Sequence, residues 1–274
     1  VWFKNLYLNG EAVTDIVIPD GITEIKKYAF YYCNPLASIK MPENIKSIGG
    51  SAFCSCAGLT SIEIPSSVKS IGNSAFSSCK NLKEVHINDI VAWCNIDFNK
   101  NSNANPLYYA RNLYLNGNLV TDLVIPDCIK EIKGYAFYNC SCFTSIEIPS
   151  SVTAIGEYAF YGCEGLTSVE FPNSVTSIGM CAFRDCTGLA SVEFPNSITS
   201  IPYHGFSGCS SLESVKIPNS IKTFEGYAFS YCSSLANIEI PNSVTSIGTY
   251  AFNGCSFTSI DIPNSVEYVQ TYAF

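Results

Sequence analysis

Charged residues are scarce in this 274-residue chain, where they make up 14% of the sequence against 47% hydrophobic residues. That composition supplies enough apolar surface for a folded core and excludes a disordered chain. Acidic residues outnumber basic ones by 23 to 15, which gives a formal net charge of −8. Nucleic acids and anionic membranes attract clustered Lys and Arg, so neither is an expected partner.

Long apolar runs and catalytic motifs are also missing. No stretch of eighteen apolar residues occurs, so we expect no membrane insertion in this segment. The chain has only two histidines, His86 and His204, and it lacks a nucleophile elbow, a phosphate loop and an HExxH motif. No signal-peptide pattern is present either, but Val1 falls in the middle of a repeating unit, so we expect a fragment of a longer parent protein.

What the sequence does contain is a repeat of 23 residues. A cysteine follows a phenylalanine by three residues in nine places, and prolines keep the same period until Pro263, which comes one residue early. A fixed period in the twenties predicts units that stack because none can bury its apolar face alone. The nine cysteines are Cys33, Cys56, Cys79, Cys140, Cys163, Cys186, Cys209, Cys232 and Cys255.

One unit shows how the chain is expected to run. Leu59, Ile62 and Ile64 alternate inward as in a short strand, and Pro65 ends that strand because it has no N–H to donate. Later in the unit, Val68 and Ile71 face inward again, and Ala75, Phe76 and Cys79 form a far wall. We therefore predict a curved rod of roughly eleven stacked 23-residue coils, each with one short parallel strand and otherwise mostly irregular structure.

The pattern LxxIxIPxSVxxIGxxAFxxCxx resembles the BspA-like, Treponema-type leucine-rich repeat family over almost the whole chain. The resemblance implies a leucine-rich-repeat solenoid in an extracellular, secreted or cell-surface protein. It also implies adhesion or other protein binding, with a host matrix protein or another cell-surface protein as ligand. The family supplies no catalytic motif to carry over, so we expect no enzyme and no cofactor.

The period is interrupted once, because Phe76 and Phe137 lie 61 residues apart. We expect one solenoid domain over residues 1–274, composed of a coil block at 1–87, a longer hairpin-containing coil at about 88–125 and a second coil block at 126–274. Within the longer coil, residues 112–117 and 120–126 predict a hairpin around an Asn-Gly pair. Nearly the same sequence occurs 107 residues earlier, at residues 5–10 and 13–19.

The rest of the interruption, residues 92–107, predicts a short helical turn and an Asn-rich loop. Insertions in repeat arrays often carry binding, so Trp93 belongs to a second candidate binding set with Tyr138 and Tyr161, two members of a tyrosine stripe on the far wall. The alternative is that the insertion is a spacer with Trp93 packed beneath it, and that the tyrosines cover the core.

The nine repeated cysteines are expected to be free, buried fillers, because a linear column of thiols suits neither disulfide geometry nor a tetrahedral zinc site. Among the others, Cys54 and Cys181 are expected to be the most accessible. Cys181 also lies one coil before His204, but a Cys-His nucleophile is not inferred, since neighbours in a column are expected in any repeat. The remaining cysteines outside the column are Cys94, Cys128 and Cys142.

The strongest functional signal is a column of outward residues in the predicted strands. Stacking places like charges about one strand spacing apart, which is costly unless a basic protein or Ca²⁺ neutralises them. The alternative is that the charges only keep the sheet soluble. The candidate partner-binding residues are Glu63, Glu147, Glu170, Glu193, Lys216, Glu239 and Asp261.

We accordingly expect a monomeric, non-catalytic surface protein-binding module or adhesin whose partner binds the concave acidic strand face. The alternative is a passive rigid spacer or stalk that displays another domain.

Overall fold

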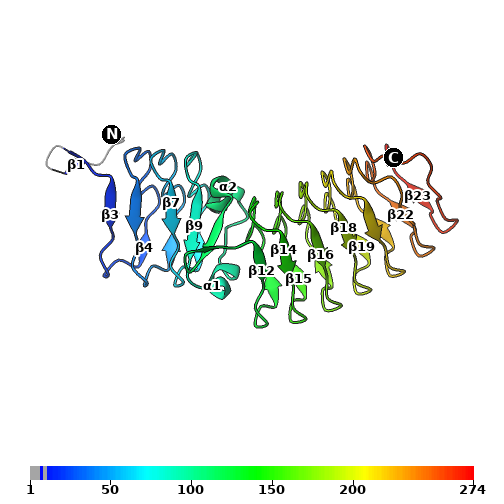
Figure 1. Ribbon diagram of the computed structural model, residues 1–274, viewed down its shortest axis with the longest axis horizontal. Helices are drawn as coiled ribbons and strands as arrows, with labels where there is room; N and C mark the ends of the chain where they lie inside the picture. The colour runs from blue at the N-terminus through cyan, green and yellow to red at the C-terminus, as the bar shows by residue number, and fades with distance from the viewer. Residues whose placement is uncertain (1–6, 9–10) are drawn as a thin grey trace. The chain divides into compact units, whose positions relative to one another are not determined.

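A computed structural model describes residues 7–8 and 11–274 and contains two compact units. Unit 1 comprises residues 1–120 with 138–140, and unit 2 comprises residues 121–137 with 141–274. Each unit is a stack of coils of about 23 residues with few helices, the solenoid that the repeat predicts (Figure 1). The finer expectation of one domain in three blocks stays a prediction.

Unit 1 begins with a hairpin and continues through coils that each contribute short strands. Its helical elements are the α-helices α1 (Ile90–Cys94) and α2 (Leu107–Ala110), with a 3-10 turn at Ser102–Ala104 between them. Its strands are β1 (Tyr7–Leu8), β2 (Glu11–Ala12), β3 (Asp15–Val17), β4 (Glu24–Ile25), β5 (Ser38–Lys40), β6 (Ser47–Ile48), β7 (Ser61–Glu63), β8 (Ser70–Ile71), β9 (Glu84–Ile87), β10 (Leu113–Leu115) and β11 (Asn118–Leu119).

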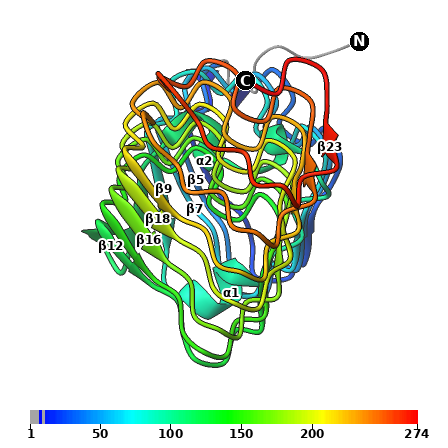
Figure 2. The same ribbon diagram turned by 90° about the vertical axis from the view of Figure 1, so that its right-hand side faces the viewer.

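Unit 2 has no helix among its described residues and repeats the same coil from end to end. In Figure 2, β16 and β18 follow each other along one wall of these coils. The strands of unit 2 are β12 (Asp122–Val124), β13 (Glu131–Ile132), β14 (Ser145–Glu147), β15 (Ala154–Ile155), β16 (Ser168–Glu170), β17 (Ser177–Ile178), β18 (Ser191–Glu193), β19 (Ser200–Ile201), β20 (Ser214–Lys216), β21 (Thr223–Phe224), β22 (Ser246–Ile247) and β23 (Tyr268–Val269).

A typical coil contains two strands, one more than the sequence predicts. The first strand has three residues before the proline, and it forms parallel sheets such as β16-β18-β20. The second strand has two residues and follows the Ser-Val turn; it forms parallel sheets such as β19-β21-β22-β23. The sequence does not predict the second strand, because two residues are too few to show the alternation that distinguishes a strand from a bend.

The core of each unit is a column of stacked phenylalanines. In unit 2 the ring centroids of Phe137, Phe160, Phe183 and Phe206 follow one another at 5.2–5.4 Å. Glycines after the second strands let adjacent coils approach closely; a Cβ at Gly156 would lie 2.4 Å from the backbone nitrogen of Gly134. Coil spacing therefore depends on small residues at these contacts as well as on the ring column.

The interruption closes the coil stack of unit 1. Asp89 caps α1 by accepting hydrogen bonds from the N–H groups of Val91 and Ala92, and Trp93 packs edge-on against Phe98 in the core. The carbonyl of Asp97 accepts the N–H of Ile71 at 2.9 Å, so this segment continues the column of second strands. The packing of Trp93 beneath the insertion agrees with the spacer alternative.

The predicted hairpin is present, but its second strand is not the predicted one. Strand β10 pairs in antiparallel fashion with β11, across Asn116 and Gly117, which both have positive φ. The run at 120–126 instead supplies β12, which pairs in parallel with β14 of the next coil. A strand followed by a proline fits the coil pattern, and that pattern prevails over proximity to the turn. The equivalent Asn9-Gly10 turn lies outside the described residues.

Candidate protein-binding surface

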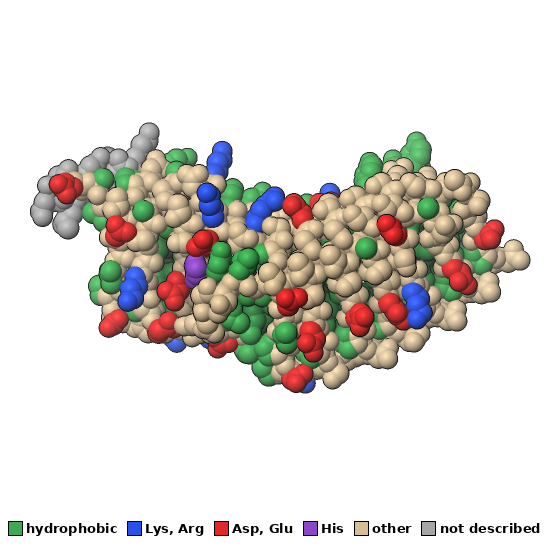
Figure 3. All heavy atoms as spheres, in the orientation of Figure 1, with side chains coloured by type: hydrophobic (Ala, Val, Ile, Leu, Met, Phe, Trp, Pro, Cys, Tyr) green, Lys and Arg blue, Asp and Glu red, His purple; other side chains and the backbone are tan. Residues whose placement is uncertain are grey.

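The first strands of unit 2 hold one outward column in register. In each strand the middle residue points into the core, and the residues on either side of it point outward. Pairing places Glu170 opposite Glu193, and Glu193 opposite Lys216. We call the exposed residues Glu147, Glu170, Glu193, Lys216, Glu239 and Asp261 the acidic column. Figure 3 shows separate acidic side chains spread along this unit.

Lys216 partly neutralises the acidic column from within. Its Nζ pairs with Oε1 of Glu193, and both side chains are largely exposed. An exposed pair of this kind contributes about 0–1 kcal/mol. Glu170 keeps a like-charged neighbour in Glu193, so a repulsion that a basic partner would relieve remains in the ladder.

Glu63 occupies a different setting in unit 1. It is exposed on β7, and its register partner on β9 is His86, whose ring nitrogen lies 3.0 Å from the carboxylate of Glu84. The same outward place in β3 and β5 is held by Val17 and Lys40. The column of unit 1 is therefore mixed in charge, and Glu63 does not belong to an acidic run.

A row of hydroxyls lies beside the charged residues. Ser145 donates a 2.5 Å hydrogen bond to Asp122 in the preceding coil, and Ser38 makes the same bond to Asp15 in unit 1. These serine hydroxyls, helped by Thr121 and Thr14, lower the pKa of Asp122 and of Asp15. Both carboxylates thus stay charged at the first coil that follows each hairpin.

The second candidate set is mostly inaccessible. Trp93 is 1% exposed and Tyr138 is 8% exposed, so neither presents a surface for a partner. Tyr161 is half-buried, and the guanidinium of Arg184 lies 5.8 Å from its ring centre. Among the residues whose burial the structure describes, the exposed tyrosines are instead Tyr28, Tyr32, Tyr203, Tyr231, Tyr268 and Tyr272. Several tyrosines of this wall stack on one another, as Tyr227 and Tyr250 do at 4.9 Å.

The cysteine column has a structural task beyond filling space. Seven of the nine thiols donate to the carbonyl of the phenylalanine one coil earlier; Cys186 reaches Phe160 at 3.1 Å and Cys209 reaches Phe183 at 3.2 Å. Eight of the nine column cysteines are buried as predicted, and Cys255 is half-buried. Burial raises the pKa of Cys79 and of Cys255 to about 12, and it also raises the pKa of Cys186 and Cys209.

The prediction about accessible cysteines is half wrong. Cys54 is half-buried, but Cys181 is only 2% exposed because it lies in the back wall between neighbouring coils. The exposed cysteine is Cys128, which lies in the turn after a strand proline. Burial raises the pKa of Cys181 and lowers that of His204, the reverse of what an activated thiolate-imidazolium pair requires.

Metal ligands do not converge in the described part of the chain. No group of three His, Cys, Asp or Glu side chains there is placed to hold an ion. The search of the same residues for membrane-spanning helices found none of sufficient length and apolarity.

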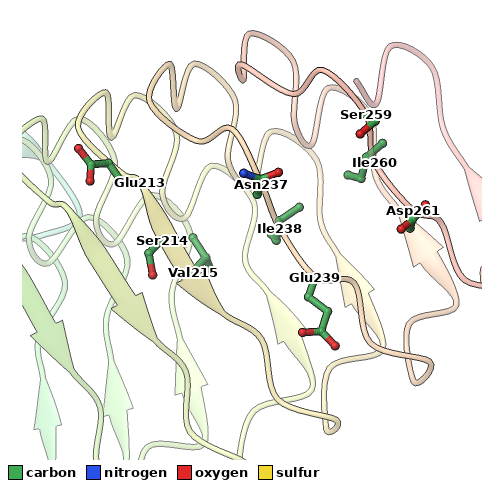
Figure 4. Close-up of a pocket in the computed structure, with 9 residues that line it drawn as sticks. All are labelled: Glu213, Ser214, Val215, Asn237, Ile238, Glu239, Ser259, Ile260 and Asp261. Carbon is green, nitrogen blue, oxygen red and sulfur yellow. The ribbon is translucent and has the colours of Figure 1, made fainter.

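Three shallow hollows lie on the strand side of the coils. One in unit 1 lies over β7 and the end of β9, and a second in unit 2 lies beside Glu170 and Glu193. The largest of the three, about 510 Å³, lies between β20 and the two coils that follow it (Figure 4). All are open grooves rather than enclosed cavities, a shape that suits a macromolecular partner better than a small molecule.

Comparisons with known proteins give a consistent family. A model described as the BspA type leucine rich repeat region matches in six copies, over residues 4–119, 109–169 and 153–274. A search of curated proteins found no match.

Among solved structures, a leucine-rich repeat protein from Eubacterium ventriosum is 23% identical, with a TM-score of 0.62 over 93% of this chain and 80% of its own. One from Bacteroides ovatus is 28% identical, with a TM-score of 0.60 over 92% and 67%. A leucine rich cell surface protein from Faecalibacterium prausnitzii is 27% identical, with a TM-score of 0.52 over 94% of this chain and 60% of its own.

Proposed function

This chain belongs to the BspA-type leucine-rich repeat family, and on that premise we propose that it is a cell-surface adhesin module that binds a protein partner through the acidic column of unit 2. The family suggests a protein-interaction module, and the F. prausnitzii relative is described as a cell surface protein. Leucine-rich repeat proteins are generally non-catalytic, in keeping with the absence of catalytic motifs from the sequence.

The observation that carries the proposal is the register of the acidic column. Glu170 and Glu193 are exposed, adjacent and alike in charge, and only one of them has a cationic neighbour in the ladder. A basic partner would remove the remaining repulsion and gain charge-assisted hydrogen bonds. Small serines beside the column leave the backbone accessible to a broad surface.

The test measures binding of purified host matrix proteins to the immobilised chain, by surface plasmon resonance. The Glu170→Lys, Glu193→Lys double variant should weaken binding at least about tenfold and should fold normally, since exposed substitutions usually change stability by less than about 0.5 kcal/mol. The association rate of the unaltered chain should fall as salt is added, because screening reduces long-range steering.

The matched control replaces two exposed tyrosines, Tyr203→Ser with Tyr231→Ser, and should leave binding unchanged. A partner that is lost on the tyrosine replacement and indifferent to the charge reversal would move the site to the far wall. Failure of every matrix protein to bind would favour the alternative function, a rigid spacer.

A further inference from the structure

The ladder of first strands stops at β20, although the sequence pattern of a strand continues. Residues 237–240 and 259–262 alternate as the earlier strands do, and each run is followed by a proline, Pro241 or Pro263. Neither run forms a strand or joins a sheet in the part of the chain that the structure describes. The second strands of the same coils remain paired, in the sheet β19-β21-β22-β23.

Backbone groups that pair elsewhere have no backbone partner here. In two earlier coils of unit 2 the residue after the first strand donates to the next coil, as Ile125 does to Glu147 at 3.0 Å and Phe194 does to Lys216 at 3.3 Å, whereas the N–H groups of Ile148 and Phe171 make no such bond. Among the described residues, the equivalent N–H groups of Ile217 and Ile240 make no backbone hydrogen bond. Unpaired strand edges of this kind are templates for the addition of another strand.

The core is also partly uncovered at this place. Val215, Ile238 and Ile260 hold the inward middle position and are half-buried, whereas Val169 and Val192 at the same position are 2–3% exposed. The ladder is interrupted between β14 and β16 as well, yet Ile146 there is buried. Among the described first strands of unit 2, only the coils after β20 therefore combine open backbone edges with accessible apolar side chains beneath them.

The ring column is more widely spaced in the coils that open. Phe224 stands on its second strand where Ile155, Ile178 and Ile247 stand in other coils, and it is fully buried against Phe252. The rings of Phe206, Phe229, Phe252 and Phe274 follow at 5.6–5.8 Å, wider than in the earlier coils. The wider ring spacing accompanies the loss of first-strand pairing after β20, although β14 and β16 are also unpaired where the rings of Phe160 and Phe183 lie 5.2 Å apart.

The charge of the groove selects its occupant. Its acidic residues are Glu213, Glu239 and Asp261, and no Lys or Arg lines it. In Figure 4 these residues come from three successive coils, with Ile238 and Ile260 between the acids. We propose that this groove binds an extended basic peptide segment of the protein partner by β-strand addition, with apolar side chains alternating with Lys or Arg.

This inference rests on the proposed function and names the partner's chemistry. The added strand pairs its backbone with the open edges of β20 and of residues 237–240. Its inward side chains cover Val215 and Ile238, and its outward Lys or Arg side chains face Glu239 and Asp261. Main-chain pairing supplies affinity in such complexes, and the alternating side chains supply specificity.

The probe is a fluorescently labelled peptide, Lys-Val-Lys-Val-Lys-Val, titrated with the full chain and followed by fluorescence anisotropy. A matched peptide with N-methyl groups on alternate residues keeps the charges but cannot pair along that edge, and it should bind at least about tenfold more weakly. A Glu-Val peptide of the same length should not bind. Hydrogen exchange should show new protection at residues 214–217 and 237–240.

Two charge-reversed variants locate the site. Glu239→Lys with Asp261→Lys should reduce affinity at least about tenfold, whereas Asp127→Lys with Glu164→Lys, an equal change on exposed residues outside the acidic column and the groove, should reduce it less than about threefold. Equal binding of the N-methylated peptide would overturn strand addition. Loss of affinity on Glu170→Lys with Glu193→Lys, but not on Glu239→Lys with Asp261→Lys, would overturn the groove and leave the acidic column as the binding surface. Insensitivity to both variants would count against both proposals.

Discussion

Unit 2 contains two kinds of coil with nearly the same sequence pattern. We call a coil closed where its first strand forms, and open where the equivalent residues form no strand. The closed coils carry β12, β14, β16 and β18, and the open coils carry residues 237–240 and 259–262. Val192 in a closed coil is buried, and Ile238 at the equivalent place in an open coil is half-exposed. A strand pattern is thus permissive for pairing but does not ensure it, and loss of pairing uncovers the core only in the coils after β20 among the described first strands of unit 2.

Thiol accessibility should show the largest difference between the two kinds of coil. Cys186 lies buried in a closed coil, whereas Cys255 is half-buried in an open one. We expect Cys255 to react with a thiol reagent at least about a hundredfold faster than Cys186, which needs wider opening of the fold. Site-resolved mass spectrometry measures both rates in one sample, with the exposed Cys128 as the fast reference. Equal rates would mean that the coils open together.

Alkaline pH should destabilise the fold through the same thiols. Burial raises the pKa of Cys186, so the unfolded chain ionises first: this stabilising contribution is complete below a pH of about 8.5 and is lost as the pH rises towards the folded pKa. Each such thiol lowers the free energy of unfolding by up to ~1.4 kcal/mol per pH unit in that window.

Urea unfolding under reducing conditions from pH 8 to 10.5 should therefore show a slope that becomes shallower by that amount in Cys186→Ala. The Cys128→Ala variant, whose side chain is exposed, is the control and should keep the full slope. An identical slope in Cys186→Ala and the unaltered chain would contradict the assignment.

Substitution of the inward strand residue tests the comparison directly. Val169→Thr places a hydroxyl in a closed, buried position and should cost about 1–3 kcal/mol, the usual penalty of an unsatisfied buried polar group. Val215→Thr makes the same change at the edge of the groove, where water reaches the hydroxyl, and should cost less than about half as much. Urea unfolding compares the two, and similar costs would show that Val215 is as dry as Val169.

The smallest effect concerns charge. Glu170→Gln should stabilise unit 2 by about 0.2–0.5 kcal/mol by relieving repulsion with Glu193, its ladder partner. Glu239→Gln should change nothing measurable, because residue 239 has no ladder partner among the described strands. High salt should abolish the difference between the variants. A gain that persists in high salt would indicate a cause other than repulsion.

Some features of the surface were beyond sequence reasoning. Trp93 and Tyr138 have the residue types of binding anchors, yet the helical cap and the coil wall bury them. In the sequence, Lys216 is the single basic residue of the acidic column. The strand register places it opposite Glu193, with which it forms an ion pair. The sequence contains one signal of the groove after β20, which is the early position of Pro263. That position does not predict the direction in which a coil is displaced.

The sequence by itself determined the period, the inward columns of Phe and Cys, the outward acidic column and the family, because a strict repeat places equivalent side chains in equivalent surroundings. Only the tertiary structure decided where that equivalence fails. Packing between coils depends on side chains from several coils together, as where Phe224 lies against Phe252 of the next coil. Pairing of the first strands, exposure of Ile238 and the open edge at Ile217 depend on how neighbouring coils pack, which no single repeat encodes.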